Sequence, residues 1–394
     1  MKVYADNAST TKIDKDLLDK MYHFSSEIYG NPSSLHSAGR KAKRILEKAR
    51  ETVAESLNCE PENIIFTHSG SEANNLALRG KLVIGSNIEH KSVLKNIYFD
   101  KSWSIIKANN KGIINPKEVE KRIKNIYIWF CSQNKYETYN SNFYNDDMYR
   151  YIVSVMTVNN ELGTINDMRN IIDVCHYYGL EVHTDYTQAM GHKYLNTEQF
   201  HADYITISGH KIHAPKGIGV LYARNVNTLS PIVLGGGQEQ GKIAGTENVV
   251  MAFAIAEMIK KYNNKDLIRK NNKRVKELRK LFINRISAIP NCYINGDNKY
   301  HIENIMNISI AGIEAESLML MLDMKGIYVS SGSACNSKEI APSYVLTAIK
   351  NEYPYSTIRI SINEENTEEE MIYMADELIK AVDILRKANP NYSN

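Results

Sequence analysis

The sequence predicts an α/β protein with a large domain built on a mainly parallel β-sheet, followed by a smaller α+β domain. Strand-like runs alternate with helical segments through roughly the first 250 residues, which is typical of parallel strands joined by crossover helices. After that point the alternation gives way to long Lys-rich helical sequence and then to a few strands and helices. A chain of 394 residues with 43% hydrophobic residues is long enough to bury more than one core.

The elements of the large domain follow from periodicity. Residues 39–58 carry apolar side chains at helical spacing, namely Ala42, Ile45, Leu46, Ala49, Val53 and Leu57. The β-rich run 63–67 comes next, and Ser69 with Glu72 then fits a capping box that opens another helix. A helical segment lies around 171–178. Further strand-like runs cover residues 151–158, 180–185, 203–208 and 218–223.

The small domain starts with a long helical stretch from residue 250 to about 286 and ends with the amphipathic sequence 367–388. We predict the boundaries as 15–255 for the large domain, and 1–14 with 256–394 for the small domain. Residues 129–151 are rich in Asn and Tyr and lack a clear period, which indicates a surface connection and not an aromatic binding site.

Composition limits the class of protein. A formal net charge of +3 gives no sign of nucleic-acid binding, since scattered Lys and Arg usually form a solvated surface. The five cysteines form no CxxC pair: Cys59, Cys131, Cys175, Cys292 and Cys335. No disulfide framework, zinc site, signal peptide or membrane span is recognisable. These features predict a soluble cytoplasmic protein without nucleic-acid or membrane partners.

A lysine stands at the predicted carboxyl end of a strand. Lys211 lies between His210 and His213 in the Gly- and Pro-rich sequence SGHKIHAPKGIG, directly after the strand-like run 203–208. In open α/β sheets ligands bind at this edge, and a lysine there can form a Schiff base. The alternative is an exposed lysine, which is the usual role of a single lysine.

Two further motifs offer groups that suit pyridoxal phosphate (PLP). Asp185 ends a strand-like run, and Gln188 follows three residues later. A carboxylate paired with the pyridinium nitrogen strengthens PLP as an electron sink, although Asp185 equally fits a helix cap. The loop 67–75 runs into a helix start, where backbone N–H groups and the Ser71 hydroxyl would receive a phosphate, although many Gly/Ser-rich helix starts look similar. His90 precedes a helix and would stack on a ring or move protons, unless it is a structural histidine.

One cysteine has an unusual setting. Cys335 lies in SSGSACNSKEI, between a strand-like GIYV and the helix-starting PSYVLTAI. A structural cysteine belongs in an apolar core, whereas here the neighbours are very small residues, among which Gly332 is the least restrained in backbone conformation. We interpret this residue as a reactive thiol on a segment that can move.

Together these motifs resemble the cysteine desulfurases, PLP enzymes in the class V branch of the fold-type I aminotransferase group. The resemblance covers nearly the whole chain, in the family's order, and includes YADNASTT, GNPSSLHSAGRKA, FTHSGSEANNLA, IEHKSVL, VNNELGTI, HTDYTQAMG, GGGQEQG, AGTEN, SSGSACNS and STIRIS. It implies PLP as the cofactor and the PLP-dependent transferase fold type I, in which the large domain has a mainly parallel seven-stranded sheet.

The resemblance assigns the cofactor to Gly70, Ser71, His90, Asn160, Asp185, Gln188, Ser208, His210, Lys211 and Thr246. It implies that Lys211 carries PLP covalently, that Asp185 pairs with the pyridine nitrogen and that Gln188 binds the ring hydroxyl. The phosphate is assigned to Gly70, Ser71, Ser208 and His210. Thr246 would reach the phosphate of a neighbouring subunit, which implies a homodimer with shared active sites.

Lys211, His90 and Cys335 are the catalytic residues that the resemblance implies, with His90 stacked on the ring. Asn160 and Arg359 would hold the substrate L-cysteine, Arg359 by its α-carboxylate. Cys335 as a thiolate would take the sulfur as a persulfide, leaving L-alanine. The SSGSAC form resembles the branch that supplies iron–sulfur scaffold proteins, so the predicted partner is such a scaffold or another sulfur acceptor. No resident metal is predicted, and whether Cys335 transiently binds iron beside a scaffold stays open.

The chain departs from the family pattern at Gln240 and Ile243, where arginines are usual, and along residues 129–151. The absence of these positive charges implies weaker electrostatic steering of the substrate or an altered edge of the dimer interface. Two other functions fit the same motifs: a selenocysteine lyase or other class V PLP lyase or aminotransferase, and a non-catalytic partner in sulfur trafficking. The sequence leaves open the preference for cysteine over selenocysteine and the identity of the sulfur acceptor.

Overall fold

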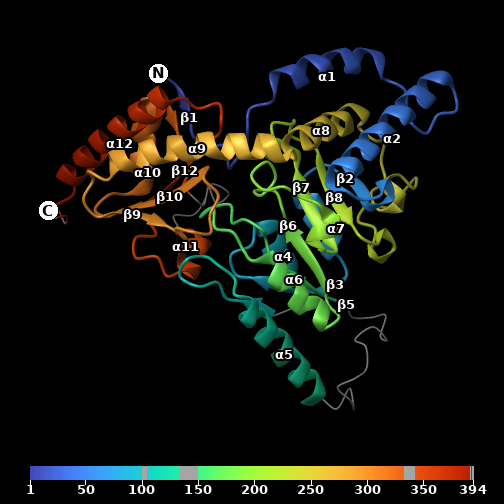
Figure 1. Cartoon of the computed structure of the whole chain (residues 1–394), viewed down its shortest axis with the longest axis horizontal. Coiled ribbons are helices and arrows are strands. Elements are labelled where there is room, and N and C mark those ends of the chain that lie inside the picture. The colour runs from blue at the N-terminus through green and yellow to red at the C-terminus, as the bar shows by residue number, and fades with distance from the viewer. Residues whose placement is uncertain (100–103, 133–149, 332–341, 391, 393–394) are drawn as a thin grey trace.

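A seven-stranded sheet forms the centre of the large domain, on the right of Figure 1. This computed structural model describes residues 1–99, 104–132, 150–331, 342–390 and 392. The strand order is β2 (Ile64–Thr67), β8 (Gly219–Ala223), β7 (Tyr204–Ser208), β6 (Glu181–Asp185), β5 (Arg150–Ser154), β3 (Lys81–Ser86) and β4 (Ser104–Ile106). Strand β8 runs antiparallel to β2 and β7, and the other pairs are parallel. The predicted mainly parallel seven-stranded sheet is confirmed.

Helices cover both faces of this sheet (Figure 1). One face packs against α2 (Ser37–Leu57), α6 (Met168–Tyr177) and α8 (Val249–Tyr262), and the other against α3 (Gly70–Leu78) and α4 (Lys91–Phe99). Successive strand residues point to opposite cores, as Ile152 and Val153 do on β5. Both faces are therefore apolar, which explains why the strands read as uninterrupted hydrophobic runs. The large domain also contains α1 (Lys15–Glu27), α5 (Pro116–Ser132) and α7 (Thr197–Phe200).

The small domain is built on a three-stranded antiparallel sheet in the order β12 (Thr357–Ser361), β10 (Ile305–Ile310) and β9 (Cys292–Asn295). Its core is shared with α9 (Lys265–Ile286), α10 (Ala315–Met324) and α12 (Glu368–Ala388), and α11 (Tyr344–Ala348) precedes β12. The N-terminal β1 (Val3–Tyr4) pairs in parallel with β11 (Ile327–Tyr328). The first residues of the chain thus begin in the small domain, and the predicted domain boundaries stay predictions.

The helical stretch expected from 250 to 286 is divided into α8 and α9 at Asn263 and Asn264. The Asn264 side chain caps α9 by accepting from the N–H groups of Asp266 and Leu267. The Asn263 side chain accepts from Leu195 N at 2.8 Å and donates to Leu195 O at 2.7 Å. Asparagine side chains compete with the helical backbone for hydrogen bonds, so this pair ends one helix and starts the next.

The start of α3 and the connection 129–151 differ from the predictions. Ser69 caps α3 by accepting from Glu72 N at 3.1 Å, but the Glu72 carboxylate accepts from His68 N and not from Ser69 N, so only half of the capping box forms. The connection predicted over 129–151 begins as helix, because α5 continues to Ser132, and β5 already starts at Arg150. The remainder of that connection, 133–149, lies outside the described residues.

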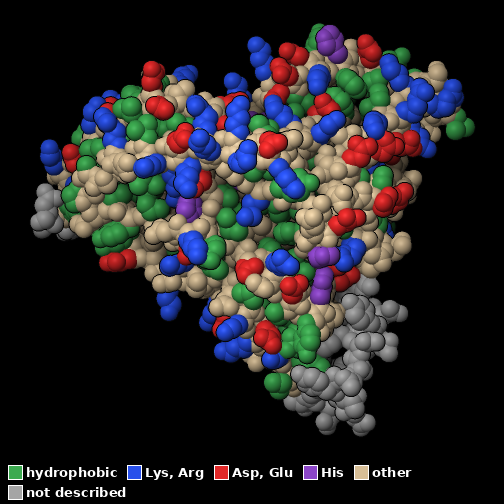
Figure 2. Space-filling model, viewed as in Figure 1, with side chains coloured by type: hydrophobic (Ala, Val, Ile, Leu, Met, Phe, Trp, Pro, Cys, Tyr) green, Lys and Arg blue, Asp and Glu red, His purple; other side chains and the backbone are tan. Residues whose placement is uncertain are grey.

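The surface carries charges of both signs. Figure 2 shows Lys and Arg side chains interspersed with Asp and Glu side chains over both domains on the face in view. Within the described ranges, no helix combines the length and apolar character that a bilayer crossing requires. In that same part of the chain, no three or more His, Cys, Asp and Glu side chains gather in a way that could hold a metal ion.

Candidate active site

Lys211 lies where the sequence predicts, directly after the carboxyl end of β7, in a short 3-10 turn (Gly209–Lys211). Its Nζ donates to the backbone carbonyls of Ala8, at 2.5 Å, and Ser9, at 2.6 Å. These acceptors belong to residues 6–11, which we call the N-terminal segment. The motif YADNASTT contains this segment, but nothing in its side chains indicates that its carbonyls hold the lysine.

Asp185 ends β6, the neighbour of β7 in the sheet, and only 7% of it is exposed. Its Oδ1 accepts from Thr187 N at 3.0 Å, and its Oδ2 accepts from Asn74 Nδ2 at 2.9 Å. Asp185 therefore does more than cap the following turn, because a side chain from another element also holds it. Gln188 Nε2 donates to Ala8 O at 2.9 Å, the same carbonyl that Lys211 uses.

The start of α3 forms a small cradle with the end of β7. A methyl group added at Gly70 would lie 3.0 Å from Ser208 Cβ and 3.5 Å from the Thr187 hydroxyl. Backbone N–H groups at a helix start and hydroxyls from two other segments are donors that suit a phosphate. His210 is nearby, with Nδ1 3.1 Å from Thr10 Oγ1, and burial lowers the pKa of His210 to about 4, helped by the neighbouring Lys211 charge. Thr187 was not identified from the sequence, although it lies in the motif HTDYTQAMG.

Gly70→Ala is expected to weaken cofactor binding while the protein stays folded. The new methyl group would occupy the cradle beside Ser208, whereas alanine suits a helix start. A rise of about tenfold or more in the PLP dissociation constant is expected, since a charge-assisted hydrogen bond contributes roughly 1.5–3 kcal/mol. Asn75→Ala, on an exposed position of the same helix, is the control and should bind like the wild type. Unchanged binding by Gly70→Ala would remove the cradle from the cofactor site.

His90 stands at the start of α4, beside the same group of residues. Its Nδ1 lies 2.7 Å from Ser92 Oγ, and Ser92 N donates to it at 3.2 Å. Burial lowers the pKa of His90, against the opposing attraction of Asp185 and with a further small decrease from Lys211. The imidazole is therefore neutral near neutral pH, and it lies within electrostatic reach of both predicted cofactor partners.

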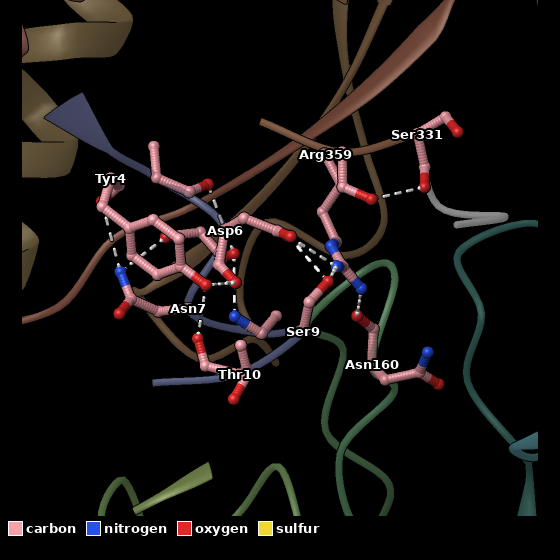
Figure 3. A network of polar contacts seen from close by, with 12 residues as sticks. Tyr4, Asp6, Asn7, Ser9, Thr10, Asn160, Ser331 and Arg359 are labelled. Atoms are coloured by element: carbon pink, nitrogen blue, oxygen red, sulfur yellow. Dashed lines mark hydrogen bonds and ion pairs between the residues drawn. The ribbon is translucent and has the colours of Figure 1, made fainter. Parts of the chain in front are cut away.

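Arg359 and Asn160 meet on the small-domain side of the site (Figure 3). Arg359, on β12 and 4% exposed, donates from Nη1 to Asn160 O at 2.9 Å. Its Nη2 donates to Asp6 Oδ1 at 2.9 Å and to Ser9 Oγ at 2.6 Å. Its buried Nε has no hydrogen-bond partner among the described residues. Asp6 and Ser9 were not identified as site residues from the sequence, and the motif YADNASTT was the only signal for them.

The predicted nucleophile Cys335 lies outside the described residues. On the N-terminal side of 332–341, Ser330 N donates to Arg359 O at 3.1 Å. On the C-terminal side, the Ser343 hydroxyl donates to the buried Glu161 carboxylate, beside Asn160. The described residues that precede and follow the cysteine segment are therefore attached next to the two predicted substrate residues.

Three positions lie apart from the residues around Lys211: the predicted site residue Thr246, and Gln240 and Ile243, where the chain departs from the family pattern. Thr246 is exposed and shares no hydrogen bond with the described members of the site. Ile243 is 4% exposed and packs in the core beneath α3 and α4, where an apolar side chain is favoured over a charge. Gln240 Nε2 donates to Glu62 O at 3.0 Å. The roles suggested for these three positions stay predictions.

Glu89, which precedes His90, is expected to make stability fall as the pH rises. It is fully buried, its Oε1 accepts from Met156 N at 3.0 Å, and burial raises its pKa from 4.5 to about 8. Between pH 4.5 and about 8, the folded protein keeps a proton that the unfolded chain has lost. The contribution of Glu89 to the free energy of unfolding is therefore complete below pH 4.5 and disappears as the pH rises through about 8. Glu89→Gln, which cannot ionise, should flatten the decrease in urea midpoint across this window. Glu118→Gln, at an exposed position, should keep the wild-type slope; an unflattened slope in Glu89→Gln would contradict the prediction.

The chain is similar to known proteins over nearly its whole length. A family model of aminotransferase class V matches residues 3–135 and 145–374. The chain is 33% identical to the cysteine desulfurase IscS of Dictyoglomus turgidum, over 99% of its own length and 96% of that protein's. It is 34% identical to the cysteine desulfurase IscS 1 of Archaeoglobus fulgidus, with 99% of each chain covered. The structure of a NifS-like protein from Rickettsia africae is similar with a TM-score of 0.84 at 27% identity, over 97% of this chain and 100% of that one.

The fold and the site together define a PLP-dependent enzyme of fold type I. The chain belongs to the class V aminotransferase family, among its cysteine desulfurases. The resemblance seen in the sequence is thereby confirmed, together with PLP as the cofactor. The residues present fit this group: Lys211 at a strand end, Asp185 for a ring nitrogen and the Gly70 cradle for a phosphate.

Proposed function

We propose that this enzyme transfers the sulfur atom of L-cysteine to the thiol of Cys335. L-Cysteine and the Cys335 thiol give L-alanine and a Cys335 persulfide. The C–S bond of the substrate breaks, an S–S bond forms, and the proton of the thiol is balanced by one gained at the β-carbon. The carbon is reduced by two electrons, and each of the two sulfurs is oxidised by one.

The observation that carries this proposal is the meeting of two cationic groups on Ser9. Its carbonyl accepts from Lys211 Nζ at 2.6 Å, and its hydroxyl accepts from Arg359 Nη2 at 2.6 Å. The lysine that would hold the cofactor and the guanidinium that would hold an α-carboxylate are thus separated by a single residue. An α-amino acid has its amine and its carboxylate on one carbon, so this spacing suits such a substrate.

Each of the chain's own groups has a separate task in this proposal. PLP, when bound, supplies an electron sink for negative charge at the α-carbon. Lys211 would hold the cofactor and Asp185 would keep its ring nitrogen protonated. Arg359 would orient the carboxylate of the substrate, and His90 would hold or move a proton beside the ring.

Cys335 would act as the acceptor and carrier of sulfur. The thiolate is the nucleophilic form of cysteine, and attack on the substrate sulfur leaves the persulfide on the protein. The SSGSAC sequence and the similarity to IscS proteins support an iron–sulfur scaffold, or another protein thiol, as the next acceptor. A resident metal is not part of this proposal.

Intact-mass measurement after incubation with L-cysteine tests the function and the nucleophile together. The wild-type protein should gain the mass of one sulfur atom, mapped to the Cys335 peptide, with an equal amount of L-alanine formed. Cys335→Ala should retain bound PLP and gain no sulfur, whereas Cys292→Ala, a cysteine on β9, should behave like the wild type. Undiminished sulfur release by Cys335→Ala would instead favour a lyase that needs no protein thiol.

We also propose that the enzyme is a homodimer. Large apolar side chains are exposed on α1, on the connection to α2 and on the segment before the 3-10 turn Glu239–Gly241: Leu18, Tyr22, Tyr29, Leu35, Val233 and Leu234. Exposed apolar groups of this size commonly mark protein contacts, and the exposed Thr246 would then reach the partner's cofactor. Sedimentation of a monomer of the wild-type enzyme would contradict this arrangement.

A further inference from the structure

Asn74 joins two parts of the active site that come from different elements. It lies on α3 with 1% of its surface exposed. Its Nδ2 donates to Asp185 Oδ2 at 2.9 Å and to Ser92 Oγ at 2.8 Å. Both amide protons are therefore used. A reversed amide would direct its oxygen at the Asp185 carboxylate, so the hydrogen-bond pattern fixes the orientation.

The same hydrogen bonds fix where His90 carries its proton. Ser92 Oγ accepts from Asn74, so its own proton is available to His90 Nδ1, 2.7 Å away. Ser92 N also donates to Nδ1, at 3.2 Å. A backbone N–H can only donate, so Nδ1 is the acceptor and a neutral His90 carries its proton on Nε2. The two ring nitrogens therefore have different roles before any ligand binds.

We propose that Asn74 is a positioning residue that couples Asp185 to His90 through Ser92. Its amide holds the Asp185 carboxylate in place for the pyridine nitrogen and, by occupying the acceptor side of the Ser92 hydroxyl, directs that hydroxyl as a second donor to His90 Nδ1. Asn74 and Ser92 act through these two side chains and touch no reacting atom. This role rests on the proposed cofactor site around Lys211. It explains why an amide is buried here with its Oδ1 unpartnered among the described residues: the site uses only the donor end.

Three variants separate the two arms of this network. Asn74→Asp keeps the size of the side chain but turns both donors into acceptors, which places a carboxylate against Asp185 and takes the Ser92 proton. Ser92→Ala removes the hydroxyl that joins Asn74 to His90 and leaves the hydrogen bond between Asn74 and Asp185 in place. Asn75→Asp is the matched control, since Asn75 is the exposed neighbour on the same helix and its side chain bonds to Ser71 O and Asn96 instead of to Asp185 and the Ser92 hydroxyl. If Asn74→Asp does not fold, Asn74→Leu removes the amide without adding charge and is assessed in the same way.

Two readouts test the coupling without relying on turnover. The dissociation constant for PLP should rise about tenfold or more in Asn74→Asp and change less than about twofold in Ser92→Ala and Asn75→Asp. Ring nitrogen NMR of histidine-labelled, cofactor-free protein should place the His90 proton on Nε2 in the wild type. In Asn74→Asp the Nδ1 signal should shift, because Nδ1 then loses the Ser92 hydroxyl as a donor and keeps only the backbone N–H of Ser92.

Either of two results would overturn the proposal. One is an Asn74→Asp protein with wild-type PLP affinity and an unchanged His90 signal. The other is an equal loss of affinity in Asn75→Asp, which would indicate general damage to α3. A wild-type protein that forms no alanine from L-cysteine would contradict the proposed function alone, because neither readout depends on that reaction.

Discussion

Lys211→Ala is expected to give a colourless protein that forms no measurable L-alanine from L-cysteine. The variant loses the amine that would bind PLP covalently, together with the two hydrogen bonds to Ala8 O and Ser9 O. A decrease of about 10²–10⁴-fold or more in kcat is expected, the range that the loss of a positioned proton-transfer group alone produces. Visible absorbance of the purified protein and alanine formation measure the two effects.

Two controls make this prediction specific to the amine. Lys211→Arg keeps a positive charge beside Ala8 and Ser9 but cannot attach the cofactor, so it should be as inactive as Lys211→Ala. Lys216→Ala, at an exposed position a few residues further on, should remain yellow and active. Borohydride should fix PLP to the Lys211 peptide of the wild type. A tag on any other lysine would show that the site has been assigned to the wrong residue.

Arg359→Lys is expected to raise KM for L-cysteine by about tenfold or more while PLP binding stays unchanged, because a point charge replaces the planar guanidinium that can fork onto a carboxylate. The substitution keeps a positive charge at this position of β12, beside the Asp6 carboxylate. The sharpest measurement compares L-cysteine with cysteamine, which lacks the carboxylate. The wild type should bind L-cysteine much more tightly than cysteamine, as measured by the change in the spectrum of the bound cofactor. In Arg359→Lys this difference in affinity between the two ligands should be smaller.

Asp6→Asn tests the support of the guanidinium separately. It removes the partly buried ion pair without changing the size of the side chain, so the free energy of unfolding should decrease, and KM should rise less than in Arg359→Lys. If Arg359→Lys weakens L-cysteine and cysteamine equally, Arg359 has a structural role and does not bind the carboxylate.

Several features of the protein were predictable because they are encoded over short stretches of sequence. Apolar residues at a spacing of three or four positions predicted α2, and uninterrupted apolar runs predicted the inner strands of the large sheet. Lys211 and Asp185 were recognisable because each directly follows or ends such a strand, and the carboxyl ends of parallel strands lie at one edge of a sheet. The motifs could therefore be assigned to one site before their geometry was known.

Other features depended on contacts that no short stretch encodes. Ala8 lies 203 positions from Lys211 in the sequence, and Ser9 lies 350 positions from Arg359. The helix break at Asn263 also depends on distant partners, since its side chain binds the backbone of Leu195. From the sequence alone this stretch reads as continuous helix, because the apolar residues keep helical spacing on both sides of the break.

The sequence by itself determined the layers of the fold, the family and the chemical types of the groups that the reaction needs. Only the tertiary structure decided that residues 6–11 connect the lysine, the glutamine and the arginine, and that Asn74 links Asp185 to His90. The physical reason is that side-chain periodicity is a local property, whereas every residue carries the same backbone carbonyl and any asparagine the same amide. The path of the folded chain determines which of these carbonyl and amide groups form hydrogen bonds in the active site.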